Sequence, residues 1–341
     1  LDLSGLASML AGDLDTSVQH YNRAIALFRE LDDRARLASS LMGRASTVSS
    51  TLARLVSVPA SSLPDATSDI KEALRIAGEI GSAPTEAWAH WSLGLLQTVQ
   101  GHFGCALQVL QSGLRIASEI GHREYVVGTQ CALGNLYIEL LAPELAKGQL
   151  EETLALAIEL RSQIWIHQAT GALAEVYLML DDRKLAQTCQ ETVISPHTPM
   201  DTMGKRYCWA RRSELALAQD DPALALDIAD RLIASAPGMS PGRVITFLWM
   251  LKAEALAVLQ HREDALSLLH TALENAQATG ERSLQWRVHA RLMRLYRVLG
   301  YQEAAERQLS AARALMDEFA ASIPDQTLQY NLRQGASSML R

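Results

Sequence analysis

This chain of 341 residues is poor in cysteine and in long apolar runs, and each shortage excludes a class of protein. Its four cysteines form no CxxC pair and have no histidine at metal-ligand spacing, which argues against a zinc site or a disulfide framework. We expect them to be free, buried thiols in a reducing compartment, and we therefore expect a cytoplasmic protein. No apolar run reaches the ~18 residues that a membrane span needs, so no membrane partner is expected.

Motifs for catalysis and for phosphate binding are also missing. The sequence contains no HExxH, GxSxG or GxxxxGK(S/T), and its nine histidines show no ligand spacing. Ser68 and Lys71 have the SxxK spacing of serine acylases, but the companion motifs are absent. Ser68 lies at the start of an expected helix, where a hydroxyl serves the free amide groups. We therefore predict a protein that is not an enzyme and that holds no cofactor and no metal.

The overall composition favours a helical protein that does not bind nucleic acid directly. Runs of Val, Ile and Thr are nearly absent, whereas Ala, Leu, Glu, Gln and Arg dominate, as in helices. Hydrophobic residues make up 48% of the chain, which is enough for a continuous core. The formal charge of −7 argues against the clustered basic surface that nucleic acids require.

The most informative pattern is a repeat of about 40 residues. Seven alanines stand 39 or 40 residues apart: Ala66, Ala106, Ala146, Ala186, Ala225, Ala265 and Ala305. Each of the last six follows a turn-like site by five residues: Gly101, Leu141, Asp181, Asp220, Gln260 and Gly300. Each also follows a second, mostly small residue by twelve: Gly94, Gly134, Ala174, Ser213, Ala253 and Met293. A fixed period of this length is typical of stacked helical hairpins, whose helices need small residues where they cross.

The small residue, the turn and the alanine together resemble tetratricopeptide (TPR) repeats. The matching residues are Leu93–Gly94, Leu133–Gly134 with Tyr137, Leu173–Ala174 with Tyr177, Leu292 with Tyr296, Ala265–Leu269–Ala272 and Ala305–Leu309–Ala312. The resemblance implies an all-α, right-handed α-solenoid of about eight TPR-like hairpins, with helices longer than the family's usual period of 34 residues allows. We expect this array over residues 1–324.

The end of the chain predicts a separate capping helix over 325–341. Pro324 cannot continue the preceding helix, and Asp325 can cap a new one that runs to Met339. Leu328, Leu332 and Met339 form one apolar stripe, which we expect to pack on the last hairpin because a stacked array otherwise leaves its final apolar face in water.

Three Pro-rich stretches interrupt the period. An insertion near 55–64 lies between the two helices of one hairpin, and linkers lie at Ser195–Pro199 and Ala236–Gly242. We favour surface loops for all three; the alternative is a lid or a partner-contact loop.

The final stretch, from Leu295 through Ala305 to Leu332–Arg333, is similar to the C-terminal part of the repeat arm in large bacterial signal-transduction NTPases and maltose-regulator-like activators. In those proteins the arm senses a ligand or partner and controls an upstream nucleotide-binding domain. The resemblance implies an upstream NTPase or effector domain in the full-length chain, since this sequence begins at Leu1 inside what already resembles a repeat. It implies a non-catalytic protein-interaction or ligand-sensing domain of a larger bacterial signalling and transcriptional-regulation protein. The alternative is an autonomous TPR scaffold that assembles proteins without sensing a ligand.

Candidate binding residues follow from the TPR register, in which the first helix of each hairpin lines a concave groove. Positions six and three before the small residue, and one after it, predict a groove formed by Trp88, Trp91, Asn135, Glu175, Tyr207, Glu214, Phe247, Glu254, Arg287 and Arg294. The three glutamates form an acidic ladder beside aromatic residues and a basic end. We expect the groove to bind a protein or peptide partner or a small-molecule effector. The alternative is that the glutamates pair with neighbouring helices and the tryptophans belong to the core.

Overall fold

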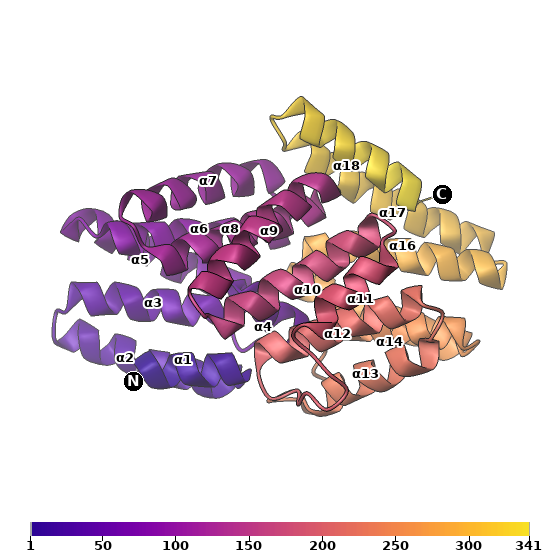
Figure 1. Cartoon of the computed structure of the whole chain (residues 1–341), viewed down its shortest axis with the longest axis horizontal. Helices are drawn as coiled ribbons and strands as arrows, with labels where there is room; N and C mark the ends of the chain where they lie inside the picture. Colours follow the sequence, from indigo (N-terminus) through magenta and orange to yellow (C-terminus); the bar gives the residue numbers. More distant parts are fainter. Residues whose placement is uncertain (1, 341) are drawn as a thin grey trace.

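Every regular element of the chain is an α-helix within residues 2–340, which the computed structural model describes (Figure 1). The helices form eight hairpins: α1 (Asp2–Ala11) with α2 (Leu14–Glu30), α3 (Arg34–Ser49) with α5 (Leu63–Ile80), α6 (Ala83–Val99) with α7 (Phe103–Glu119), α8 (Arg123–Glu139) with α9 (Pro143–Glu159), α10 (Gln163–Met179) with α11 (Arg183–Glu191), α12 (Met203–Ala218) with α13 (Pro222–Ala234), α14 (Thr246–Val258) with α15 (Arg262–Thr279), and α16 (Arg282–Leu299) with α17 (Gln302–Ala321). Two helices stand outside this pattern, α4 (Thr51–Val56) and α18 (Gln326–Met339). The predicted all-α solenoid of TPR-like hairpins is confirmed.

The seven repeat alanines are buried between paired helices, as the period predicts. Each is at most 1% exposed. The residues twelve positions before them lie where the helices cross: a Cβ added to Gly134 would lie 2.5 Å from the Leu150 side chain. The Ser213 hydroxyl donates a hydrogen bond of 3.0 Å to the carbonyl of Ala225, across the same crossing. Small residues at both positions therefore set how closely the helices approach.

The turns of the repeat adopt the left-handed backbone conformation. Each of the six turn-like sites has a positive φ: Gly101 (78°), Leu141 (52°), Asp181 (58°), Asp220 (61°), Gln260 (69°) and Gly300 (80°). The connections between hairpins repeat this conformation at Gly81, Gly121 and Arg161, which stand 40 residues apart. Glycine adopts it without steric cost, whereas a side chain such as that of Arg161 does not.

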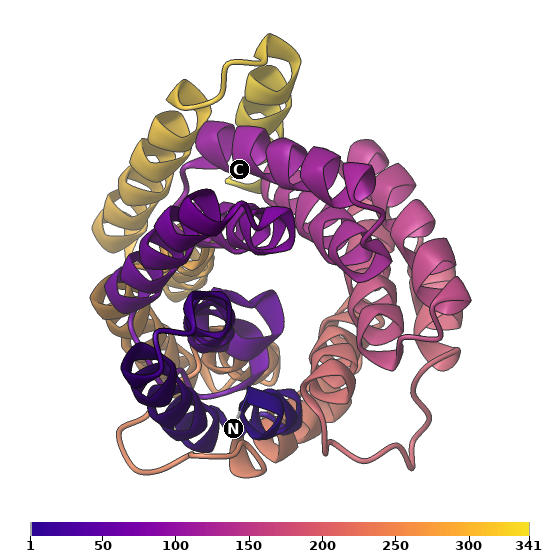
Figure 2. The ribbon, with the colours of Figure 1, turned by 90° about the vertical axis from the view of Figure 1, so that its left-hand side faces the viewer.

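The solenoid closes on itself. Helix α16 contacts α6, and α12 contacts α1, although four hairpins lie between the members of each pair. Figure 2, which looks along the long axis of the molecule, shows this full turn of the array as a ring. The Phe319 ring lies 5.0 Å from the Phe103 ring, and an added Cβ at Gly104 would collide with the Ser322 carbonyl. One apolar core consequently joins α6 and α8 to α16, α17 and α18.

Residues 55–58 of the insertion near 55–64 are buried, so the interpretation of the whole insertion as a surface loop is wrong. The short helix α4 and the residues after it pack on α12 and α14, where Leu52, Val56 and Val58 are at most 5% exposed. The buried Arg206 of α12 fixes the segment, because its guanidinium donates to the Val56 carbonyl (3.0 Å) and to Ser235 Oγ (2.8 Å). The apolar residues Leu55, Val56 and Val58 of the insertion provide the driving force for this inward fold.

The C-terminal helix begins where the sequence places it. Asp325 accepts a hydrogen bond of 2.9 Å from the backbone amide of Leu328, as an N-cap does. Leu328 and Leu332 are buried, but Met339 is 44% exposed, so its expected place in the apolar stripe is wrong. Leu340 takes this place because it continues the four-residue spacing of Leu328 and Leu332. Residues 1 and 341, which bound the two expected domains, lie outside the described residues.

The cysteines differ in exposure. Cys131 and Cys208 are buried and Cys189 is half-buried, whereas Cys105 is exposed, contrary to the expectation of four buried thiols. Burial raises the pKa of the Cys131 thiol to about 12, which keeps it protonated and unreactive. None of the helices described is long and apolar enough to cross a membrane.

Glycine at position 161 should stabilise the chain. Arg161 has a φ of 53° at the position that Gly81 and Gly121 occupy in the two preceding repeats, and its side chain is exposed. We expect Arg161→Gly to raise the free energy of unfolding by about 1 kcal/mol in urea titrations. The reverse change, Gly121→Arg, should lower it by a similar amount, since open space surrounds Gly121 and only the backbone is strained. Equal stability of both variants and the parent would contradict this account.

Removal of 325–341 should make the chain associate. The buried side chains of Leu309 and Phe319 and the half-buried Leu315 share one core with α18, and the truncation would expose part of that core. Light scattering during size-exclusion chromatography should then show oligomers. The exposed Met339 provides a control, because Met339→Gln should leave the chain monomeric. A truncated chain that stays monomeric and equally stable would show that α18 is a dispensable tail.

Candidate functional site

The ten predicted groove residues lie on the first helices of six consecutive hairpins, α6, α8, α10, α12, α14 and α16. These helices face the axis of the ring (Figure 2). Ring closure brings the helices of distant hairpins together there, and the expected open groove is divided. The residues separate into a charged centre, an aromatic cluster, and an apolar groove at one end.

The charged centre pairs the acidic ladder with the basic end. The Glu175 carboxylate forms ion pairs with Arg211 (2.7 Å) and with Arg287 (3.2 Å). Arg211 also forms an ion pair with Glu214 (2.7 Å), and Arg287 forms one with Glu139 (3.2 Å). The side chains of Glu175, Arg211 and Arg287 are only 10%, 5% and 13% exposed. We call these five residues the central ion network; it ties α8, α10, α12 and α16 together.

Burial and pairing act in opposite directions on these carboxylates. Burial raises the pKa of Glu175, but the nearby Arg211 and Arg287 outweigh it and hold that pKa below its usual range. For Glu214, burial outweighs the attraction of Arg211, and the pKa lies above its usual range. Arg211 and Arg287 therefore stabilise Glu175 as a buried anion, and Glu175 in turn offsets the cost of burying two guanidinium groups.

Tyr207 and Phe247 support the network and are closed to solvent. The Arg211 guanidinium lies 4.9 Å from the Tyr207 ring centre and 5.0 Å from that of Phe247, so both rings make cation–π contacts with it. Their exposures are 0% and 1%, and the expectation that they line an open groove is wrong. Asn135 is also buried, and its amide donates to the Cys131 carbonyl at 2.8 Å. Helix α4 packs on α12 and α14, the helices that carry Tyr207 and Phe247.

Trp88 and Trp91 belong to a half-buried aromatic cluster. Their ring centres lie 6.0 Å and 6.4 Å from that of Tyr125, and Trp91 lies 5.4 Å from Trp165. The Trp165 indole nitrogen donates to Glu124 at 2.6 Å. Tyr125 and Trp165 were not among the predicted residues, although each stands nine residues before a small residue of the repeat, Gly134 and Ala174 respectively. That register would have found them.

Glu254 and Arg294 line an apolar groove of about 320 Å³ between α14 and α16. We call it the α14–α16 groove. Its walls include Ala257, Leu295, Val258 and Val298, and the last two are 56% and 61% exposed. Glu254 forms an ion pair of 2.9 Å with Arg291, whereas Arg294 is exposed.

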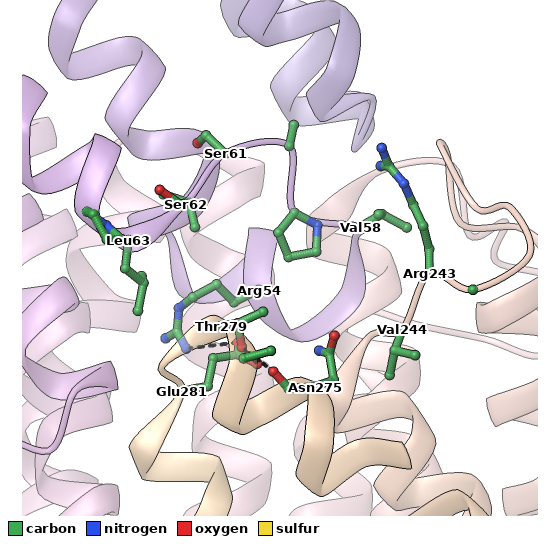
Figure 3. A pocket seen from close by; sticks show the side chains of 16 residues that line it. Arg54, Val58, Ser61, Ser62, Leu63, Arg243, Val244, Asn275, Thr279 and Glu281 are labelled. Carbon is green, nitrogen blue, oxygen red and sulfur yellow. Dashed lines mark hydrogen bonds and ion pairs between the residues drawn. The ribbon is translucent and has the colours of Figure 1, made fainter.

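A second cavity, of about 570 Å³, lies beside the insertion (Figure 3). We call it the insertion pocket. Residues 58–64, residues 242–244 and the C-terminal end of α15 enclose it, and Arg54 and Glu281 lie in its wall. Burial lowers the pKa of Arg54 and raises that of Glu281, while their mutual attraction opposes both shifts. Arg54 was not predicted from the sequence, because the neighbouring insertion was expected on the surface.

The described residues contain no group of His, Cys, Asp and Glu side chains that could hold a metal ion. No family model matches the sequence. A search of curated proteins likewise finds no match.

The solved structures that resemble the chain are helical repeat proteins. A Rap protein complexed with competence and sporulation factor has a TM-score of 0.59 and 15% identity, with 94% of this chain and 75% of that chain covered. NprR in complex with its cognate peptide NprX has a TM-score of 0.57 and 11% identity, over 95% and 97%. A monomeric mutant of IFIT1 with m7Gppp-AAAA has a TM-score of 0.51 and 12% identity, over 99% and 77%. At these identities the similarity establishes the TPR-like fold and no more.

The central ion network should be essential for stability. Glu175→Ala would leave Arg211 and Arg287 buried beside too few carboxylates, and we expect a loss of about 3–5 kcal/mol in the free energy of unfolding. Glu254 occupies the same register position two repeats later, but its side chain is 27% exposed and has one partner. Glu254→Ala should therefore cost about 1 kcal/mol or less. Urea denaturation of the two variants would decide, and similar small losses would show that the ladder is not structural.

Proposed function

We propose that this chain is a non-catalytic interaction domain that binds a peptide segment of a partner protein in the α14–α16 groove. The main support is the contrast within the ring. Ion pairs and α4 lie at its centre, whereas this groove keeps apolar side chains, Val258 and Val298 among them, open to solvent. Solvent-exposed apolar side chains gathered in a concave site are typical of binding surfaces.

The groove favours an apolar peptide that carries an acidic side chain. Ala257, Leu295 and the two valines offer apolar area, and each methylene buried against them contributes about 0.8 kcal/mol. Glu254 and Arg291 neutralise each other, so the exposed Arg294 provides the charge that remains for recognition. A carboxylate on the peptide would pair with Arg294 and set the direction in which the peptide lies.

Two of the similar structures support a peptide as the ligand. The Rap protein was solved with competence and sporulation factor, and NprR with its cognate peptide NprX. The IFIT1 structure holds m7Gppp-AAAA instead, so the fold alone does not decide the ligand. The net charge of −7 favours a peptide over a nucleic acid for this chain.

The wider context that we propose is a bacterial signalling protein of the cytoplasm, in which this domain senses a partner or effector and controls an upstream NTPase or effector domain. Its support is the resemblance of the final stretch to such repeat arms. The second candidate is an autonomous scaffold, which the regular array of hairpins equally suits. The full-length reading frame would separate the two, because a nucleotide-binding module upstream agrees only with the first.

A peptide selection tests the proposed groove. A phage-displayed library of random 12-residue peptides, selected on the whole chain, should yield apolar peptides with a recurrent acidic residue. Val258→Glu should weaken their binding at least about tenfold, since it places a charge in the apolar groove. Ile158→Glu is the matched control: Ile158 is 58% exposed on α9, outside the groove.

Three outcomes would count against the proposal. They are a selection that yields no specific peptide, binding that Val258→Glu leaves unchanged, and binding that Ile158→Glu weakens equally. Circular dichroism of each variant would exclude loss of the fold as the cause.

A further inference from the structure

Arg54 is a buried guanidinium without hydrogen bonds among the described residues. Its side chain is 7% exposed, and its nearest carboxylate, Glu281, lies 3.8 Å away, beyond hydrogen-bond distance. Its Nε is buried and has no partner. Glu281, in contrast, accepts hydrogen bonds from the hydroxyl groups of Thr246 (2.9 Å) and Thr279 (3.2 Å). The Glu281 carboxylate therefore has hydrogen-bond partners within the protein, whereas the Arg54 guanidinium has none among the described residues.

A nearby arginine shows what a satisfied buried guanidinium looks like in the same protein. Arg206 also lies against the insertion, and it donates hydrogen bonds to the Val56 and Leu232 carbonyls and to Ser235 Oγ. A buried charge without such bonds costs several kcal/mol, as a rule. The Arg54 guanidinium therefore keeps hydrogen-bonding capacity that no described residue uses.

The space for that group is the insertion pocket. Figure 3 shows Arg54 and Glu281 together on its wall, with Leu63 on one side and Val244 on the other. Its 570 Å³ lie within the range of small-molecule sites. Pro59 and Ala278 extend the apolar part of the lining, so a ligand with an apolar body would gain from burial there.

We propose that the insertion pocket binds a monoanionic carboxylate with an apolar body, and that Arg54 holds the carboxylate. This site is separate from the α14–α16 groove and does not depend on it. The planar fork of a guanidinium matches a carboxylate in a bidentate pair. Two sources offer this chemistry: a small organic acid, or the free C-terminus of a peptide.

The charges around the pocket favour a monoanion over a phosphate. Arg243, the other arginine of the lining, is paired with Asp15 at 3.2 Å. Glu281 adds a negative charge next to Arg54. Because Glu281 already offsets part of the Arg54 charge, a dianion would be repelled more strongly than a monoanion.

The position of the pocket connects ligand binding to ring closure. Its walls come from the connection between α3 and α5, in the second hairpin, and from α15 and the residues before α14, in the seventh. A ligand that touches both sides binds only the closed ring and therefore stabilises it. This is how a repeat domain could report an effector to the rest of a larger protein.

Calorimetry on the whole chain tests the site with two pairs of probes. Hexanoate is compared with hexanamide, and acetyl-Ala-Val-Leu with a free C-terminus is compared with its C-terminal amide. Each carboxylate should bind at least about tenfold more tightly than its amide, and inorganic phosphate should bind more weakly than either. If only hexanoate binds, the ligand is a small organic acid. If only the peptide with a free C-terminus binds, the ligand is a peptide C-terminus.

Variants assign the binding to Arg54. Arg54→Met should reduce carboxylate affinity at least about tenfold, and Arg54→Lys should recover part of it, since it keeps the charge but not the fork. Arg243→Met is the matched control and should change the affinity by no more than about threefold. Arg54→Met leaves the buried Glu281 carboxylate without its cation, which destabilises the fold. The double variant Arg54→Met/Glu281→Gln removes that charge and should show the same loss of binding.

The proposal is overturned if neither carboxylate binds up to about 10 mM, if acid and amide bind equally, or if Arg54→Met binds as the parent does. The two sites are also distinguishable. Val258→Glu should leave carboxylate binding unchanged, and Arg54→Met should leave binding of the selected phage peptides unchanged. Either site can therefore fail without the other.

Discussion

The pairing of Glu175 with Arg211 and Arg287 is the constraint around which the molecule is arranged. Arg287 lies 112 residues after Glu175, so their ion pair forms only when the last hairpin returns to the middle of the array. Buried charges of this kind tolerate little displacement, because an unpaired one is costly. The closed arrangement also accounts for the burial of Tyr207 and Phe247 and for the inward fold of α4.

The local features of the fold could be predicted from the sequence, and the long-range ones could not. The alanine period and the turn glycines reflect contacts between residues about twelve positions apart. Each repeat contains both partners of such a contact. The contacts of Phe319 with Gly101 and of Arg287 with Glu175 depend on the curvature of the whole array. Curvature results from small rotations added over many hairpins, and no single residue records it.

The candidate sites follow the same division. The register placed Glu254 and Arg294 on the correct helices, and both line the α14–α16 groove. The same register placed Tyr207 and Phe247 in solvent, because it assumes an open groove; closure buries them. Arg54 had no signal of its own, since an arginine next to an irregular, Pro-rich stretch ordinarily lies on the surface. Its burial becomes visible only with α12 and α14 in place beside it.

The packing of Phe319 against Gly101 has a consequence for the synthesis of the chain. The ribosome makes Gly101 about 200 residues before Phe319, which at roughly 5–20 residues per second is a delay on the order of 10–40 s. During that interval α6 and α7 present an apolar face whose partner does not yet exist. A nascent chain in this state is a natural client for a chaperone on the ribosome, and a pause in translation before α16 would prolong its exposure.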